Sequence, residues 1–171
     1  MNYAIKANKH VKYFYLNKVL HREDGPAIEW YDGTKEWYKN GLCHREDGPA
    51  RVYSDRSKHW YKNGKRHRED GPAAEYIDGQ YGWYINGKLH REDGPAVYTS
   101  RGEKYWFQCG ERHRLDGPAS IFSNGTTVWY INGSNVTDEI TQWAKDNDID
   151  LDNLTYEDKA LIKLVWADYG K

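Results

Sequence analysis

The sequence has few cysteines and no long apolar run. Its 171 residues include two cysteines, Cys43 and Cys109, which fall at different positions of the repeat described below and so do not suggest a disulfide framework. No apolar run is long enough to cross a bilayer, and the segment MNYAIKANKHVKYFY lacks the apolar core of a secretory signal peptide. These absences argue against a disulfide-stabilised extracellular domain and against a membrane protein. We therefore expect a cytoplasmic protein without a membrane partner.

Aliphatic side chains are also scarce, whereas aromatic ones are abundant. Only 38% of the residues are hydrophobic, but 15% are aromatic, with eight tryptophans and fifteen tyrosines. A disordered chain is poor in aromatic residues. The composition therefore predicts a folded protein that buries large rings in place of aliphatic side chains.

One heptapeptide recurs through the chain at a fixed interval. HREDGPA occupies residues 21–27, 44–50, 67–73 and 90–96, and HRLDGPA occupies residues 113–119, so the five copies begin at equal intervals. The same interval separates five tryptophans and five glycines between the copies: Trp37, Trp60, Trp83, Trp106 and Trp129, and Gly41, Gly64, Gly87, Gly110 and Gly133. A fixed period of this length indicates a repeat array. Residues 1–20, with Phe14 at the tryptophan position, are interpreted as a degenerate first copy.

Each repeat contains the turn and strand signals of a hairpin. Asp-Gly and Asn-Gly pairs favour tight turns, and the segments AIEWY and TKEWYK have the length and aromatic content of strands. All five prolines lie in the heptapeptide, which is therefore a corner, because proline cannot donate to a strand ladder. We predict a mainly β fold: a single-layer antiparallel β-meander of about six two-strand repeats of about 23 residues each.

In every repeat the tryptophan is followed directly by a tyrosine or a phenylalanine. Successive side chains of a strand point to opposite faces of a sheet, so we expect a tryptophan row on one face and a tyrosine and phenylalanine row on the other. A single layer has no second sheet to cover both faces. Some aromatic surface should therefore stay open, unless a homo-oligomer hides it.

The C-terminal segment predicts two helices. Residues 135–147 are expected to form a helix with Thr137 as N-cap, and residues 154–171 a second helix in which Thr155 and Asp158 form a capping box. The apolar positions are Val136, Ile140, Trp143 and Ala144 in the first helix, and Leu161, Ile162, Leu164, Val165 and Tyr169 in the second.

The helices imply a division of the chain into two parts. The segment DIDLDNL between them lacks the glycine and the glutamate of an EF-hand calcium loop, and we interpret it as an acidic linker. The predicted organisation is a β-repeat domain at residues 1–135 and a small C-terminal α-helical cap with this linker at residues 136–171. The cap should cover the open edge of the last repeat or part of one face.

The amino-acid sequence of the repeat resembles that of a known family. The unit is similar in length to the variant MORN-type repeats, and the pattern WYxNGxxHREDGPA resembles tandem repeats in proteins of large tailed bacteriophages, over about residues 10–135. The resemblance implies an antiparallel meander and a phage-encoded protein that acts in the host cytoplasm.

Three roles for the heptapeptide can be compared. Equivalent residues of adjacent repeats lie two strands apart, roughly 9–10 Å, so the five histidines cannot share one metal ion. Five copies in the same local context do not build the single cleft that an active site needs. A structural corner explains more, because glycine allows a special backbone, proline fixes φ, and the polar side chains can bond to neighbouring corners. We assign this structural role to His21, Arg22, Asp24, His44, Arg45, Asp47, His67, Arg68, Asp70, His90, Arg91, Asp93, His113, Arg114 and Asp116, and we assign no catalytic residue, metal or cofactor.

Binding residues are sought where the repeat varies. Residues 51–68 hold seven basic residues and a single acidic one, Asp55. Lys58 and Lys62 are expected to flank Trp60 on one face, an arrangement that suits an anionic partner that can stack. The candidate binding residues are Arg51, Arg56, Lys58, Trp60, Lys62, Lys65, Arg66, Trp37 and Trp83. The alternative is that these charges only keep an aromatic sheet soluble.

The sequence thus favours a non-catalytic repeat-scaffold binding protein. With the phage resemblance, its expected partner is a host protein, for example one of immunity, which it would inhibit as a counter-defence protein. A second hypothesis is a sponge that sequesters a nucleotide or another anionic ligand. A third is a structural virion component that self-associates along its sheet edges, and an enzyme is the least favoured, because the chain has neither a P-loop nor a nucleophile elbow.

Overall fold

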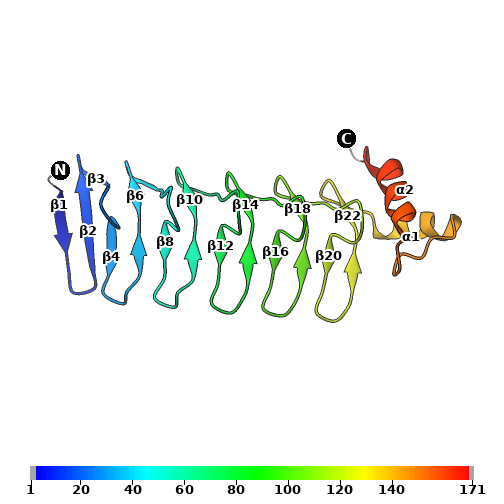
Figure 1. The fold of residues 1–171 in the computed structure, drawn as a ribbon, viewed down its shortest axis with the longest axis horizontal. Helices are drawn as coiled ribbons and strands as arrows, with labels where there is room; N and C mark the ends of the chain where they lie inside the picture. The colour runs from blue at the N-terminus through cyan, green and yellow to red at the C-terminus, as the bar shows by residue number, and fades with distance from the viewer. Residues whose placement is uncertain (1–2, 170–171) are drawn as a thin grey trace. The chain divides into compact units, whose positions relative to one another are not determined.

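A computed structural model describes residues 3–169 of the chain. Within them it is mainly β, with 23 short strands in antiparallel pairs and two helices after the last strand, as predicted (Figure 1). The chain divides into two compact units, Met1–Lys88 (unit 1) and Leu89–Lys171 (unit 2). Of the described residues, no helix is both long and apolar enough to cross a membrane.

Unit 1 contains an open antiparallel sheet to which each sequence repeat contributes two strands. Its order is β1 (Ala4–Ala7), β2 (Val11–Leu16), β4 (Ile28–Trp30), β5 (Lys35–Glu36), β8 (Arg51–Val52), β9 (Lys58–His59), β12 (Ala74–Glu75) and β13 (Tyr81–Gly82). Strands that follow one another in this path are also successive along the chain, apart from the small hairpins between them. The path is therefore the predicted meander, with two sheet strands in each repeat.

Each repeat also has a small hairpin, which turns at Asn17-Lys18 in the first copy and at Asn-Gly in the next ones. β3 (Val19–Leu20) pairs with β2, β6 (Tyr38–Lys39) with β7 (Leu42–Cys43), and β10 (Tyr61–Lys62) with β11 (Lys65–Arg66). β14 (Tyr84–Ile85) and β15 (Lys88–Leu89) lie at the boundary of the two units. Both turn residues have positive φ, 51° at Asn40 and 80° at Gly41, as a tight hairpin of this twist requires.

The tryptophan of each repeat breaks a strand that the sequence predicts to be continuous. Segment 34–39 forms β5 up to Glu36 and β6 from Tyr38, and the two pieces pair with different strands. Between them, the amide of Trp37 donates to the carbonyl of Ala50 at 2.8 Å, and its carbonyl accepts from the amide of His44 at 3.0 Å. The backbone of the tryptophan is thus used by the following heptapeptide, which is why the strand does not continue through it.

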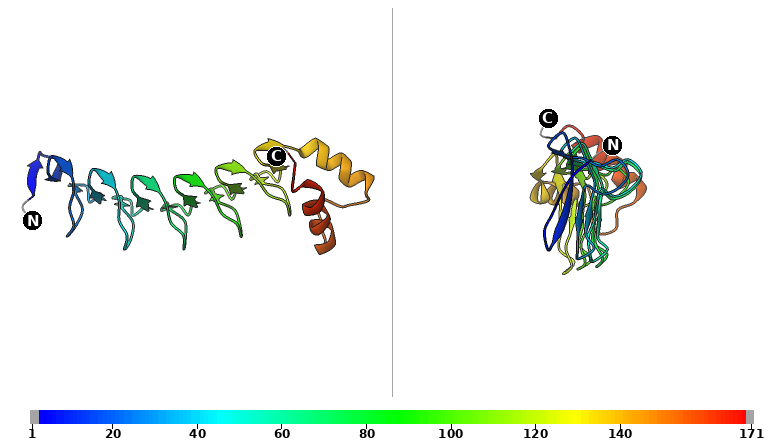
Figure 2. Two further views of the ribbon diagram at one scale, coloured as in Figure 1. Left: turned by 90° about the horizontal axis from the view of Figure 1, so that it is seen from above. Right: turned by 90° about the vertical axis from the view of Figure 1, so that its left-hand side faces the viewer.

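Unit 2 repeats the pattern and ends in the helices. Its sheet strands are β16 (Val97–Tyr98), β17 (Lys104–Tyr105), β20 (Ser120–Ile121) and β21 (Thr127–Val128), and its hairpins are β18 (Phe107–Gln108) with β19 (Glu111–Arg112) and β22 (Tyr130–Ile131) with β23 (Ser134–Asn135). Helices α1 (Thr137–Asp146) and α2 (Tyr156–Trp166) lie beside the last hairpin (Figures 1 and 2).

The helices cover the last tryptophan. Trp129 is 3% exposed and belongs to a buried cluster with Ile131, Val136, Ile140, Ile162 and Trp166. Val136 lies one repeat period after His113 and makes the same backbone bond: its amide donates to the carbonyl of Trp129 at 3.0 Å, as that of His113 does to Trp106 at 3.2 Å. The amide of Trp129 donates to the hydroxyl of Thr137 at 3.0 Å. The cap therefore begins at the position where the next corner would begin.

Two details of the helices differ from the prediction. The N-cap of α1 is Val136 and not Thr137, whose hydroxyl accepts from Trp129 and so is drawn back to the sheet. In α2 the buried residues are Ile162 and Trp166, whereas Leu161, Leu164 and Val165 are exposed. The predicted apolar set of α2 was wrong at these three positions and at Tyr169, which is exposed and follows the end of the helix, because α2 packs on the rest of unit 2 along a narrow stripe only.

The capping box of α2 is confirmed. The amide of Asp158 donates to the Thr155 hydroxyl oxygen at 3.1 Å, and the amide of Thr155 donates to the Asp158 carboxylate at 2.9 Å. This pairing satisfies two amides of the first turn, which have no partner within a helix.

Candidate binding grooves between the repeated corners

In four of the corners the arginine stacks on the aromatic ring that precedes it. The guanidinium carbon lies 4.2 Å from the ring centre in the Arg45–Trp37 pair, 4.1 Å in the Arg68–Trp60 pair and 4.1 Å in the Arg114–Trp106 pair. In the first corner Arg22 stacks at 4.0 Å on Phe14, the residue at the tryptophan position. These are cation–π contacts, in which the ring also shields the guanidinium from water.

The same arginine ties its own corner together. Arg68 donates from Nε to Asp70 at 2.9 Å and from Nη1 to the Pro72 carbonyl at 3.3 Å and to Glu75 at 2.8 Å. The bonds to the aspartate and to the proline carbonyl recur in all five corners. The hydrogen bond from Arg68 lowers the pKa of the exposed Asp70 carboxyl. Arginine, aspartate and proline thus act as one bonded group.

The glycine of the corner is needed for space. A Cβ atom on Gly71 would lie 2.6 Å from the guanidinium carbon of Arg68, and one on Gly117 would lie 2.8 Å from that of Arg114. Neither glycine has a positive φ. The expected special backbone was therefore wrong here: at Gly71 and Gly117 the arginine packs over the place of a Cβ, whereas at Gly48 a Cβ would meet Arg45 at an ordinary 3.4 Å.

The histidine joins its corner to the next Asn-Gly turn. In four of the repeats Nδ1 accepts from the backbone amide of the asparagine 19 residues later, as for Asn63 and His44 at 3.1 Å, and Cys109 takes that position opposite His90. The proton of the neutral ring therefore sits on Nε2, which in His44 lies 3.2 Å from Glu46. Nδ1 is thus engaged in all five corners, and Nε2 is also bonded in His44 and in His67, where it lies 3.3 Å from Glu69.

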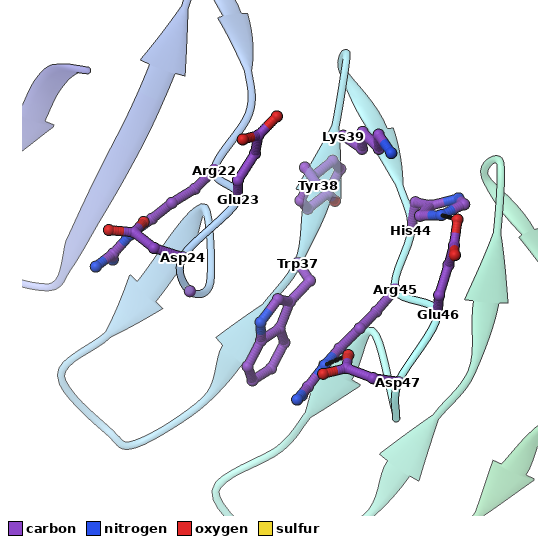
Figure 3. A pocket seen from close by; sticks show the side chains of 11 residues that line it. Arg22, Glu23, Asp24, Trp37, Tyr38, Lys39, His44, Arg45, Glu46 and Asp47 are labelled. Atoms are coloured by element: carbon purple, nitrogen blue, oxygen red, sulfur yellow. Dashed lines mark hydrogen bonds and ion pairs between the residues drawn. The ribbon is translucent and has the colours of Figure 1, made fainter. Parts of the chain in front are cut away.

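Open grooves lie between successive corners. Groove 1, of about 610 Å³, runs between the first two corners of unit 1, and Figure 3 shows Trp37 between Arg22–Asp24 on one side and Arg45–Asp47 on the other. Groove 2, of about 690 Å³, is formed in the same way by the next corner and contains Trp60, Lys62, Glu46 and Glu69. The corner at residues 45–47 lines both grooves. In unit 2, groove 3, of about 540 Å³, contains Trp106.

The grooves of unit 1 carry a small negative charge. Groove 1 is lined by four carboxylates, Glu23, Asp24, Glu46 and Asp47, and by three cations, Arg22, Arg45 and Lys39. The carboxylates are well exposed, whereas the side chains of the two arginines are only 20% and 26% exposed. Groove 2 has the same balance, with Lys62 in place of Lys39. A partner entering either groove therefore meets carboxylates before it meets arginines.

The predicted basic patch is not gathered into one site. Lys62 and Trp60 line groove 2, but Lys58 lies in β9 opposite Glu75, because the strand breaks at Trp60. Lys58 and Lys62 therefore do not flank Trp60 as expected. Arg56 and Lys65 are exposed outside the grooves, Trp37 lines groove 1, and Trp83 is half-buried.

Two of the predicted basic residues are instead held by tyrosines. Arg51 pairs with Glu36 at 3.0 Å and donates to the hydroxyl of Tyr38 at 3.0 Å. Arg66 donates to the hydroxyls of Tyr61 and Tyr84 and stacks over the Tyr84 ring. The tyrosine row and the tryptophan row thus use different arginines, and both rows are partly covered by the chain's own cations.

A buried histidine in unit 1 was not predicted. His59 is 4% exposed, lies between the rings of Tyr53 and Tyr76, and has no hydrogen-bond partner for Nε2 among the described residues. Burial, and then the charges of Arg66 and Arg51, lower its pKa to about 4. The signal in the sequence was that His59 stands where other repeats have Glu36, Gly82 or Tyr105.

No metal centre is formed within residues 3–169, where no group of three or more histidine, cysteine, aspartate or glutamate side chains could hold an ion.

Comparison with protein-family models gave no match to the chain, and a search of curated proteins gave no significant relative.

Proposed function

We propose that the protein is a non-catalytic repeat scaffold that binds an extended segment of a protein partner along the grooves between its corners. The observation that carries the proposal is the pair of contiguous grooves in unit 1, which share the corner at residues 45–47 and have nearly the same lining. A partner that contacts one groove reaches the next without leaving the surface. Such repeated weak contacts on one chain raise the overall affinity by making each further contact intramolecular.

The side chains of the grooves suit recognition better than catalysis. The corner arginines donate to the aspartate and the proline carbonyl of their own corner, and Nδ1 of the histidines accepts from a backbone amide, whereas the glutamates and the tryptophans that line the grooves can be met by a partner. The resemblance to phage MORN-type repeats supports a host protein as the partner and the host cytoplasm as the site of action. As part of the same proposal, binding would inhibit that host protein.

The proposal is tested by selecting ligands from a displayed library of random peptides on the full-length protein. Each enriched peptide is then measured against Glu46→Arg, which places a long cation in both grooves at an exposed position, and against Glu139→Arg, an exposed site in α1 outside the grooves. We expect Glu46→Arg to weaken binding about ten-fold or more and Glu139→Arg to leave it unchanged.

Circular dichroism of both variants checks that the fold is kept. Absence of any enriched peptide, or enriched peptides that bind Glu46→Arg as tightly as the unaltered protein, would overturn the groove-binding function.

A further inference from the structure

The spacing of the grooves restricts the conformation of a partner. Each repeat adds two strands to the sheet of unit 1, and neighbouring strands are about 4.8 Å apart, so equivalent points of groove 1 and groove 2 should be about 9.6 Å apart. An extended β-strand cannot use this spacing, because residues three apart cover about 10 Å but point to opposite faces. A polyproline II helix can: it rises about 3.1 Å per residue with three residues per turn, so every third side chain faces the same way after about 9.3 Å.

The side chains of the grooves restrict the chemistry. Trp37 and Trp60 line the two grooves, and aromatic rings are the surfaces on which proline-rich helices pack. In groove 1 the arginines are balanced by Asp24 and Asp47, to which they donate at 2.9 and 2.8 Å. Glu23 and Glu46 then outweigh Lys39, which leaves one net negative charge. Because the two grooves share Arg45, Glu46 and Asp47, together they hold six carboxylates and five cations, and their exposed glutamates are the groups that a cationic side chain would meet.

We infer that the grooves of unit 1 bind a polyproline II segment that carries a lysine or an arginine at every third position. The prolines pack against Trp37 and Trp60, and successive cations enter groove 1 and groove 2, where Glu23, Glu46 and Glu69 receive them. This inference rests on the proposed function and adds the conformation and charge of the partner. It concerns a cationic ligand, in contrast to the anionic ligand that the basic segment 51–68 suggests.

The test uses a fluorescent peptide of four Pro-Pro-Lys triplets, which forms polyproline II and spans both grooves. The matched control has the same eight prolines and four lysines, with the lysines in two adjacent pairs. Fluorescence anisotropy with the full-length protein at low salt should show binding of the triplet peptide about ten-fold tighter than that of the control, because only the first places a cation in each groove.

The variants separate groove binding from general attraction. Glu46→Gln keeps an acceptor for the Nε2 proton of His44 but removes the charge shared by both grooves, and should weaken the triplet peptide about five-fold. Glu46→Gln/Glu69→Gln should weaken it further, whereas Glu139→Gln should not.

Equal binding of the two peptides, or binding that the glutamine variants do not weaken, would overturn the inference. The peptide selection described above then decides about the proposed function. Groove-dependent ligands without a basic residue at every third position would leave that function standing, and a selection without any groove-dependent ligand would remove both.

Discussion

Arg68 stacks on the ring of Trp60 with its guanidinium carbon 4.1 Å from the ring centre, and a Cβ on Gly71 would lie 2.6 Å from the same carbon. These contacts explain why tryptophan, arginine and glycine recur together at fixed positions. The arginine fills the space that a Cβ on the glycine would need, and its donors bond the aspartate and the proline carbonyl of the corner. The heptapeptide is the same from repeat to repeat because its residues depend on one another.

Removing this arginine should destabilise the protein, to a degree that depends on its carboxylate partners. Arg68→Ala loses the stack on Trp60 and the bonds to Asp70 and Glu75, and we expect a loss of about 2 kcal/mol in the free energy of unfolding. Arg45→Ala should lose only about 1 kcal/mol, because residue 52 is a valine and offers no carboxylate.

Urea denaturation of both variants measures the difference. Arg101→Ala, at an exposed turn, serves as the control and should stay within about 0.5 kcal/mol of the unaltered protein. Equal losses for Arg45→Ala and Arg68→Ala would show that the second carboxylate contributes nothing.

A single glycine should stabilise the third repeat. Arg56 has φ of +74°, at a position where Gly33, Gly79, Gly102 and Gly125 have φ between 82° and 98°. A side chain in this region of φ is strained, so Arg56→Gly should raise the stability by about 0.5–1 kcal/mol in thermal unfolding. Gly79→Ala, the reverse change one repeat later, should lower it. A lower stability of Arg56→Gly would mean that the arginine makes a contact that outweighs the strain.

The two faces of α2 should respond differently to truncation. Ile162 is fully buried in the cluster with Trp129, so Ile162→Ala should cost about 3 kcal/mol. Leu164, 80% exposed on the same helix, should tolerate the same change within about 0.5 kcal/mol. Tryptophan fluorescence during denaturation reports both values. A large loss at Leu164 would show that another surface covers this face in solution.

Acid should weaken the fold before the carboxylates are protonated. His59 has a pKa of about 4 in the folded chain against an ordinary value of 6.5, and burial also lowers the pKa of His113. The folded state therefore binds these protons at lower pH than the unfolded state does. Stability should be full above about pH 6.5, fall as the pH is lowered toward 4 and then level off for this group, with a loss of about 3 kcal/mol from His59.

The histidine responsible can be identified by substitution. His59→Tyr places at residue 59 the side chain that unit 2 has at Tyr105, and should remove most of the slope between pH 6.5 and 4 in urea titrations. An unchanged slope would assign the pH dependence to other groups.

The two cysteines should differ in reactivity. Cys43 is buried and burial raises the pKa of its thiol to about 11, whereas Cys109 is exposed. Since the thiolate is the reactive form, a disulfide reagent at pH 8 should modify one thiol in the folded protein and two in denaturant. Rapid reaction of both thiols in the folded protein would show that the hairpin around Cys43 opens readily.

The periodicity of the sequence predicted the fold well, because each repeat pairs mainly with its neighbours and most of its turns are marked by Asp-Gly or Asn-Gly pairs. The capping box of α2 followed from Thr155 and Asp158 alone. The break at each tryptophan was missed, because strand propensity cannot reveal that the amide of Trp37 is taken by Ala50 of the following heptapeptide.

The site was predicted less well for a similar reason. The basic residues of segment 51–68 look like a patch in the sequence, but a residue's partner depends on the register. Arg51 meets Tyr38 and Glu36, and Arg66 meets Tyr84, so neither faces a groove. The grooves arise between corners one repeat period apart, and no local pattern describes a space that two distant segments enclose.

The bond between Val136 and Trp129 has a genetic consequence. The cap meets the last hairpin through the backbone bond that a further corner would use, and also through Ile131 and Leu115, where the preceding repeat has Gln108 and Glu92. Duplication or deletion of one whole repeat upstream of this last repeat would leave the docking surface of the cap intact. Recombination within the gene can thus change the number of grooves, and with it the length of the ligand site. The C-terminal cap would not have to change.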